Sequence, residues 1–248
     1  MAAVKGEPMG PEQQLMKDHG AHNYVLNSLG SRIVSGDLPS GAVVNLNSLE
    51  EEYQVSRTVI REVVRVLESH GMLQSRRRVG ITVQPMVNWD VMDESVIRWR
   101  LDGPDYEQQI QELMELRLAI EPVAARFAAE RASKDERRHL TELATTLDEL
   151  GELSEINTQE FLTTDIAFHT VLIEASKSPL LIRLVGPITE VISGRWVRNT
   201  LSKIPQTGTL LSHIAIAEAV RMGDAEAAAE SSNELLTLIF NEISTTGQ

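Results

Sequence analysis

The sequence contains no cysteine, which excludes disulfide bonds and thiolate metal sites. Aromatic residues make up only 4% of the chain, and no run of about 18 apolar residues is available to span a membrane. The N-terminal residues are polar and include proline and glycine, so they lack the apolar core of a signal peptide. We therefore expect a cytoplasmic protein without disulfide bonds.

Residues that favour helices, above all alanine, leucine, glutamate and arginine, dominate the 248-residue chain. Its composition is that of a globular protein, with 42% hydrophobic and 24% charged residues. A chain of this length forms one large domain or two modest ones. We therefore expect a mainly α-helical protein with a sizeable core.

The negative charge is unevenly distributed along the chain. The net charge is −13, yet residues 57–78 contain six arginines against two glutamates, a net +4 that leaves −17 for the remainder. Binding of nucleic acid depends on where positive charge gathers rather than on the total. The basic segment can therefore face DNA while the acidic remainder stays away from it.

The N-terminal third is expected to fold as a winged helix-turn-helix over residues 22–84. Residues 1–21 are typical of a flexible tail, and helical spacing of apolar residues starts near residue 22 and ends at Gly36. A short second helix follows, and Ser56 can cap a third over about 57–70. Residues 72–85 then indicate two short strands around a basic tip. Three helices and a β-hairpin complete the motif.

The rest of the chain indicates an antiparallel all-α bundle of six to seven helices over residues 91–244, joined to the first domain by a linker at 85–90. Breaks at glycine and proline separate the expected helices. Their ranges are about 90–101, 106–132, 135–151, 157–176, 179–199, 207–222 and 225–243.

The third helix has the features of a DNA-recognition helix. Arginines four residues apart share one helix face, and an arginine can pair two donors with the edge of a guanine in the major groove. Three such arginines also fit a solvated helix face, but the preceding helix and the wing favour DNA binding. The expected contacts are base readers Arg57 and Arg61, phosphate contacts Ser56 and Thr58, the further arginine Arg65, and the wing residues Arg76, Arg77, Arg78 and Gly80.

These residues resemble the DNA-binding domain of the GntR family, on the strength of the segments IVSGDLPSG and VSRTVIREVVRVLESHGML and the wing Gly80. The C-terminal half resembles the FCD class of that family. Three segments carry this second likeness: ELRLAIEPVAARFAAERA, DIAFHTVLIEAS and SHIAIAEAVRMGDAEAAAE. The resemblance covers about residues 22–243. It implies a homodimeric transcription regulator that binds operator DNA and a small effector.

A candidate metal site lies in the C-terminal half. Asp165 and His169 are four residues apart, so they project from one side of a helix, where a carboxylate and an imidazole can hold a divalent ion such as zinc. These residues alone also fit an ordinary hydrogen-bonded histidine. The family resemblance implies that both, together with His213, are metal ligands. The class commonly has one more histidine, at the position of Leu235, so a bound ion would need water or effector as a further ligand.

The effector is expected to be a small anion. Arg117 and Glu121 lie one helical turn apart and can form a structural ion pair, while the resemblance implies that the arginine faces the pocket. A guanidinium group binds a carboxylate through two parallel hydrogen bonds. Asp165, His169 and His213 would line the same pocket, and Arg195 and Trp196 could do so as well.

The chain resembles most closely the sugar-acid branch of the class, the galactonate and gluconate regulators. This implies a repressor that its effector releases from DNA. One alternative is the same fold sensing another carboxylate, such as lactate or an acyl chain. A more distant alternative is a small metal-dependent enzyme, although no HExxH or comparable signature is present.

Overall fold

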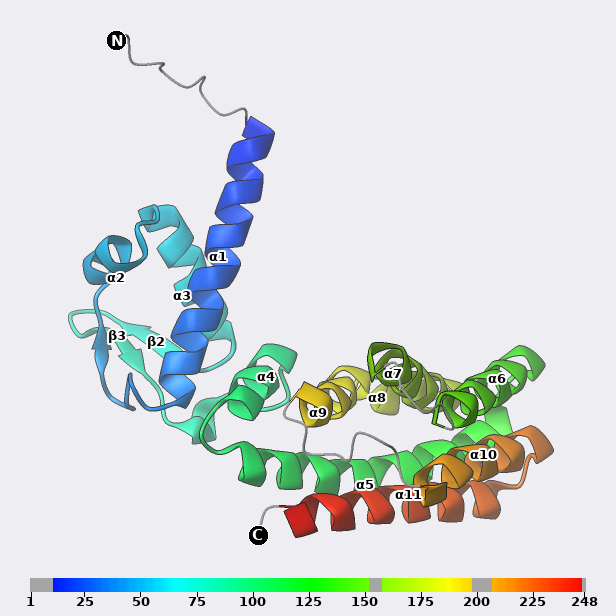
Figure 1. Ribbon diagram of the computed structural model, residues 1–248. Coiled ribbons are helices and arrows are strands. Elements are labelled where there is room, and N and C mark those ends of the chain that lie inside the picture. Colours follow the sequence, from blue (N-terminus) through cyan, green and yellow to red (C-terminus); the bar gives the residue numbers. More distant parts are fainter. Residues whose placement is uncertain (1–10, 152–157, 198–206, 247–248) are drawn as a thin grey trace. The chain divides into compact units, whose positions relative to one another are not determined.

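A computed structural model describes the backbone of residues 11–151, 158–197 and 207–246, and the side chains of residues 20–151, 159–194 and 208–243. The chain divides into two compact units, residues 1–104 and 105–248 (Figure 1). Over the described ranges, no helix combines the length and the apolar character needed to cross a membrane.

The first unit is a winged helix-turn-helix, as expected. Its sheet has the order β1-β3-β2, with both pairs antiparallel. Buried apolar side chains from α1, α3 and the strands form its core, among them Leu29, Ile60 and Val83. The elements are α1 (Pro11–Val34), β1 (Val43–Val44), α2 (Leu46–Tyr53), α3 (Arg57–Ser69), β2 (Leu73–Arg76), β3 (Gly80–Val83), a 3-10 turn (Met86–Asn88) and α4 (Glu94–Asp102).

Two features of this unit differ from the expectation. Helix α1 begins at Pro11 rather than near residue 22, so part of the expected tail is helical. Proline suits the first position of a helix, because its missing N–H would have no partner there. Strand β1 adds a third strand to the expected hairpin, with Val43 opposite Thr82. A two-residue strand is too short to leave a periodic pattern in the sequence.

The expected linker at 85–90 is packed onto the first unit. The Trp89 indole N–H donates to the carbonyl of Gln84 (2.8 Å), and the Asp90 N–H donates to the carbonyl of His70 (2.8 Å). Helix α4 belongs to the same unit, although we expected residues 91–102 in the second domain. Its Trp99 is 2% exposed, packs in the core and donates to the Asn27 side chain (3.0 Å).

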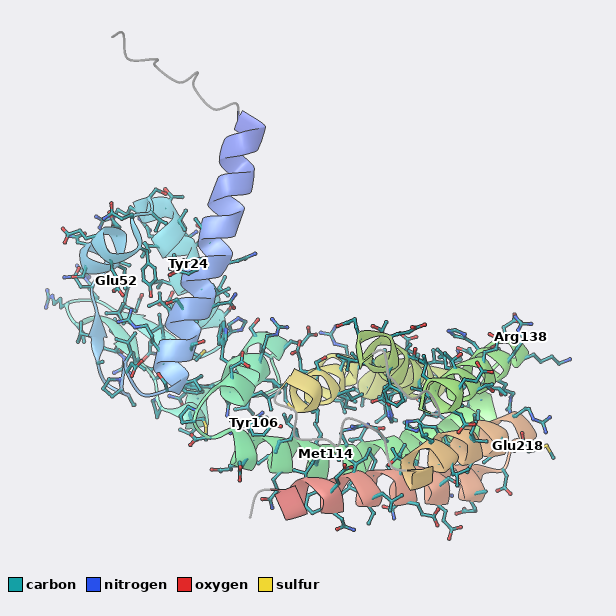
Figure 2. All side chains as sticks on the ribbon, viewed as in Figure 1. Tyr24, Glu52, Tyr106, Met114, Arg138 and Glu218 are labelled. Carbon is teal, nitrogen blue, oxygen red and sulfur yellow. The ribbon has the colours of Figure 1, made fainter. Side chains whose placement is uncertain are left out.

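In its described residues the second unit consists of helices and short connections, with buried residues such as Met114 of α5 in its interior (Figure 2). Helix α11 packs on α5 and α10, α6 packs on α7 and α10, and α7 packs on α5 and α9. The helices are α5 (Tyr106–Arg131), α6 (Lys134–Gly151), α7 (Thr158–Ala175), α8 (Pro179–Ile182), α9 (Val185–Val197), α10 (Thr207–Met222) and α11 (Ala225–Thr246).

The single helix expected over 179–199 is divided into α8 and α9. The physical reason is Pro187, which has no N–H to donate to the carbonyl of Arg183, so a continuous helix would lose a hydrogen bond there. A tight turn forms instead, with the Leu184 N–H donating to the carbonyl of Leu181 (2.9 Å). Proline is tolerated in the first turn of α9, where N–H groups have no helical partner.

The packing of α4 on α1 depends on a glycine and gives a testable prediction. A Cβ atom at Gly30 would lie 2.4 Å from the Trp99 ring. We expect Gly30→Ala to lower the free energy of unfolding by about 1–3 kcal/mol, because the ring must move within a packed core. Urea unfolding followed by circular dichroism measures this.

Gly20→Ala, on the same helix, is the matched control. Its Cβ would meet nothing within 4 Å, so the better helix propensity of alanine should raise the stability by up to about 1 kcal/mol. Equal stability changes in the two variants would contradict the packing role of Gly30.

Candidate functional site

Helix α3 presents one apolar and one basic face. The Ser56 hydroxyl caps it by accepting the Val59 N–H (3.4 Å). Five residues at helical spacing bury their side chains in the first unit: Val59, Ile60, Val63, Val64 and Leu67. Because the apolar face is fixed in this way, Arg57, Arg61 and Arg65 are left exposed, as is Thr58.

The three exposed arginines of α3 differ in their contacts. Arg57 reaches back to α2, where its Nη1 donates to Asn47 Oδ1 (3.2 Å) and lies 3.7 Å from a Glu50 carboxylate oxygen. Arg65 pairs with Glu62 on its own helix (2.5 Å). Arg61 forms no ion pair within the described part of the chain. Its guanidinium group is therefore the most available of the three for an external partner.

The wing is the tight connection between β2 and β3. Arg76 lies opposite Gly80 across the hairpin, and Arg76, Arg77 and Arg78 are all exposed. Arg78 has φ = 68° and Gly80 has φ = 103°. Left-handed geometry at Gly80 favours glycine, since it has no Cβ. The turn therefore carries three cationic side chains at its tip.

A buried network of charged and polar side chains lies in the second unit. Arg117 and Glu121, one turn apart on α5, are both 0% exposed. The Arg117 Nε donates to one Glu121 oxygen, and its Nη2 donates to the other (3.3 Å). The second oxygen also lies 2.7 Å from His169 Nδ1 of α7. Two side chains of this chain, Arg117 and His169, therefore bind the Glu121 carboxylate.

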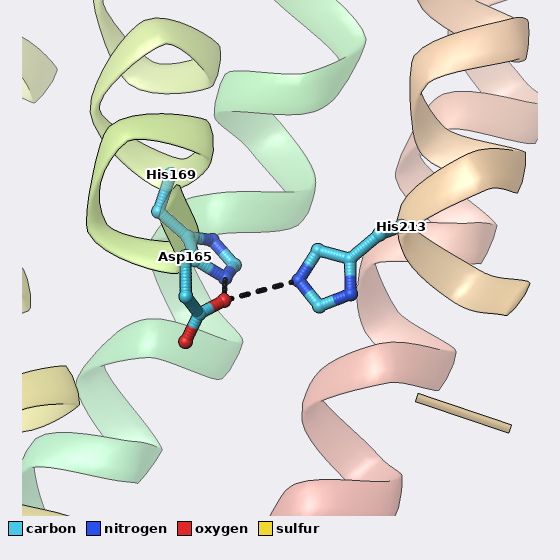
Figure 3. Close-up of side chains that lie close together, drawn as sticks. All are labelled: Asp165, His169 and His213. Carbon is cyan, nitrogen blue, oxygen red and sulfur yellow. Dashed lines mark ion pairs between the residues drawn. The ribbon is translucent and has the colours of Figure 1, made fainter. Parts of the chain in front are cut away.

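Asp165 joins the histidines of two helices (Figure 3). Its Oδ1 lies 3.4 Å from His169 Nε2, one turn further along α7, and 3.2 Å from His213 Nε2 of α10. Phe168, fully buried, packs edge-on against the His213 ring, with centroids 4.8 Å apart. The carboxylate and the two imidazoles are nearly inaccessible to solvent, with at most 6% of each residue exposed.

The hydrogen bonds of the two imidazoles decide which nitrogens are free to bind an ion. His213 Nδ1 lies 2.8 Å from the Thr209 carbonyl, which can only accept, so Nδ1 carries the proton. In a neutral His213, the Nε2 lone pair then faces the carboxylate of Asp165, and this nitrogen has no hydrogen-bond partner in the described chain. Two acceptors facing each other favour a cation between them.

The donor set of this cluster fits a divalent metal ion. One atom from each of Asp165, His169 and His213 lies within 4.8 Å of the others. The Nδ1 of each histidine faces an oxygen, of Glu121 or of Thr209, and each Nε2 faces Asp165. Metal-binding histidines characteristically have such a hydrogen bond on their second nitrogen. His169 Nε2 also lies 3.2 Å from Arg117 Nη2, so an ion there would share this nitrogen with the guanidinium group.

The network shifts the pKa values of its members. Burial by itself raises the pKa of the Glu121 carboxyl, but the charges of Arg117 and His169 outweigh it and lower that pKa to about 2. Burial acts in the same way on Asp165, but the facing imidazoles of His169 and His213 outweigh it and bring its pKa well below the ordinary value. Burial lowers the pKa of His169, yet the facing Glu121 carboxylate raises it overall.

Most of the residues that we predicted for the sensor pocket lie together. Arg117, Glu121, Asp165, His169 and His213 form one buried network. The side chains of Arg195 and Trp196 lie outside the described residues. Leu235, at the position where the class commonly has a histidine, is 0% exposed, so an apolar side chain fills that part of the core.

Two contacts in these sites were not predicted from the sequence. The Thr209 carbonyl orients His213, and the four-residue spacing on one helix could have indicated this. Asn47 holds Arg57, which links α2 to the recognition helix. No local pattern marks the second contact, because it joins residues on two different helices.

The sequence matches the family described as bacterial regulatory proteins, gntR family, over residues 22–83, and the FCD domain over residues 112–238. The galactonate operon transcriptional repressor of Escherichia coli K12 is 30% identical over 220 residues, which cover 87% of this chain and 92% of that protein. The chain belongs to the GntR family.

Other GntR-type regulators extend the likeness. The uncharacterized regulator YieP of Escherichia coli K12 is 27% identical over 226 residues, covering 90% of this chain and 96% of that protein. The solved structure of McbR/YncC from E. coli shares the fold, with a TM-score of 0.53, 17% identity, and coverage of 92% of this chain and 99% of that one. The GntR assignment confirms a DNA-binding transcription regulator and excludes the metal-dependent enzyme.

The buried ion pair of this GntR regulator gives a second prediction. Glu121→Gln leaves the Arg117 charge buried without its counter-ion, so we expect the free energy of unfolding to fall by about 3–5 kcal/mol. The depressed pKa of Glu121 also has a consequence for pH. Its stabilisation is present above the ordinary value of 4.5 and is lost as the pH falls toward about 2. The variant should show a shallower pH dependence over this interval in urea unfolding.

Glu226→Gln is the matched control, because Glu226 pairs with Arg126 of α5 at the surface. That pair is exposed and should contribute far less. Equal destabilisation by the two variants would contradict the role of burial.

Proposed function

We propose that this protein is a homodimeric repressor that a sugar acid or a related carboxylate releases from its operator. The observation that carries the proposal is Arg117, fully buried in the FCD unit, whose Nη1 has no hydrogen-bond partner among the described residues. A buried donor left in this way costs about 1–3 kcal/mol, and a carboxylate would satisfy it. The 30% identity to a galactonate operon repressor supports a sugar acid.

On the DNA side, α3 would enter the major groove and the wing would follow the backbone. Arg57 and Arg61 would read bases, with Arg57 directed by its contact with Asn47. Ser56 and Thr58 would contact phosphates near the start of the helix, and Arg65 would contact the backbone about two turns further along. The exposed wing residues Arg76, Arg77 and Arg78, with Gly80 shaping the turn, would add contacts that are independent of sequence.

The division between residues that read bases and residues that contact the DNA backbone can be tested by mutation. Arg61→Ala should cost about 1–3 kcal/mol of operator affinity and relax the preference at particular base pairs. Arg77→Ala should weaken binding to all sequences alike and lower the slope of log K against log salt by about one unit. Fluorescence anisotropy with operator variants over a range of salt concentrations measures both.

Identical effects of Arg61→Ala and Arg77→Ala on every DNA sequence would contradict this division. Arg138→Ala, on the exposed surface of α6 in the other unit, is the control and should leave DNA binding unchanged.

On the sensor side, Asp165, His169 and His213 would hold one divalent ion such as zinc, with Glu121 and Thr209 orienting the two imidazoles. The ion would supply a positive charge for the oxygens of the effector. Since Leu235 cannot bind metal, the remaining coordination positions would go to water or effector. Arg117 would hold the effector carboxylate beside this cluster.

Release from DNA requires that the effector bind one arrangement of the dimer better than another. A two-fold dimer would present two recognition helices to two half-sites of the operator. We infer that the effector favours an arrangement in which those two helices no longer fit both half-sites. The affinity for DNA would then fall although each α3 keeps its structure.

The deciding experiment is a titration of operator affinity with galactonate, gluconate and lactate, with and without added Zn²⁺ after chelation. We expect at least one acid to weaken operator binding by wild-type protein tenfold or more. Arg117→Lys keeps a positive charge near Glu121 but lacks the guanidinium group, whose Nη1 donates to the effector while Nε and Nη2 donate to Glu121. It should lose the response to the acid and keep its DNA affinity.

Arg126→Lys, at a partly exposed arginine on the same helix, is the matched control and should respond like wild type. Indifference of the wild type to every acid would contradict the carboxylate effector. Loss of DNA binding by a folded Arg117→Lys variant would contradict the separation of sensing from DNA reading.

A further inference from the structure

A second polar atom without a partner lies in the core of the FCD unit, on α11. Ser232 is 1% exposed, and its hydroxyl has no hydrogen-bond partner within the described chain. Serine and threonine inside a helix often donate to the carbonyl four residues earlier. Thr237 on the same helix does so (2.7 Å), as does Ser212 on α10 (2.9 Å). The Ser232 hydroxyl forgoes this bond, so it remains available to another group.

The register of α11 against α5 places Ser232 along the helix axis. Two contacts define this register: Arg126 pairs with Glu226, and a Cβ at Gly223 would lie 3.6 Å from the carbonyl of Ala129. Both contacts give the same antiparallel alignment. A residue one position nearer the start of α5 is level with a residue one position nearer the end of α11. Glu121 is then level with residue 231, and Arg117 is level with residue 235.

Ser232 therefore falls within the interval spanned by the Arg117–Glu121 pair. The neighbouring helix gives the same result, since a Cβ at Gly208 of α10 would lie 3.4 Å from the Leu238 side chain. From this contact, His213 is level with residue 233. One residue along a helix is about 1.5 Å. Two independent registers thus bring Ser232 to the layer of the buried network, and Figure 3 shows α11 beside the helix that carries His213.

We propose that Ser232 is a further effector-binding residue, whose hydroxyl donates to the same carboxylate that Arg117 holds. This inference rests on the proposed carboxylate effector. Arg117 Nη1 and Ser232 Oγ are both buried, both without a partner in the residues described, and both in one layer of the unit. Leaving two such buried groups unsatisfied is unfavourable, and one carboxylate can accept from both.

The test combines stability with binding in Ser232→Ala, a substitution that removes only the hydroxyl. Without effector, the melting temperature should rise by about 2–4 °C, because a buried polar group without a partner is removed. The affinity for whichever of galactonate, gluconate and lactate binds the wild type should fall about tenfold or more, as for the loss of a hydrogen bond to a charged group. Differential scanning fluorimetry and isothermal titration calorimetry give the two values.

Ser212→Ala is the matched control, since its hydroxyl already has a partner in the Gly208 carbonyl. Both variants replace a helical serine by alanine, so the difference between them isolates the unsatisfied hydroxyl. Unchanged acid affinity in Ser232→Ala would overturn the inference and leave the proposed function standing. A lower melting temperature in Ser232→Ala than in Ser212→Ala would also overturn it, because the hydroxyl would then have a structural role. A wild type that binds no acid would overturn both proposals.

Discussion

A guanidinium group inside a helical core has to be neutralised, and this requirement organises the sensor site. Removing an ion from water costs several kcal/mol, so the charge of Arg117 keeps Glu121 ionised beside it. Glu121 in turn holds His169, which faces Asp165, and Asp165 faces His213. A single buried charge thus leads to a polar chain that connects α5, α7 and α10 through the interior.

The sequence predicted the elements whose side chains repeat with helical period, and it missed those that leave no such pattern. Helix α3 was predicted because its buried valines and exposed arginines alternate over several turns. Strand β1 has only two residues, and the break before α9 depends on one proline. Residues 85–90 were predicted to be a linker because they show no periodic pattern. The hydrogen bonds that pack them onto the first unit, such as that of the Trp89 indole, leave no pattern in the sequence.

The candidate site was predictable in the same partial way. Four-residue spacing places Asp165 beside His169 and Arg117 beside Glu121, because both pairs lie on single helices. That His213 joins them is a tertiary contact, and only the family resemblance pointed to it. No local sequence pattern distinguishes Ser232. It differs from Thr237 on the same helix only in the structure, where the Thr237 hydroxyl has a hydrogen-bond partner and the Ser232 hydroxyl has none among the described residues.

The packed linker has a mechanical consequence. Trp89 and Trp99 fix the segment after the wing to the reading unit, so its stiff body ends near Gly103. The next residue, Pro104, has a φ angle locked by its ring. Any rotation of α4 would therefore turn α3 as well, because side chains of both helices pack in the same core.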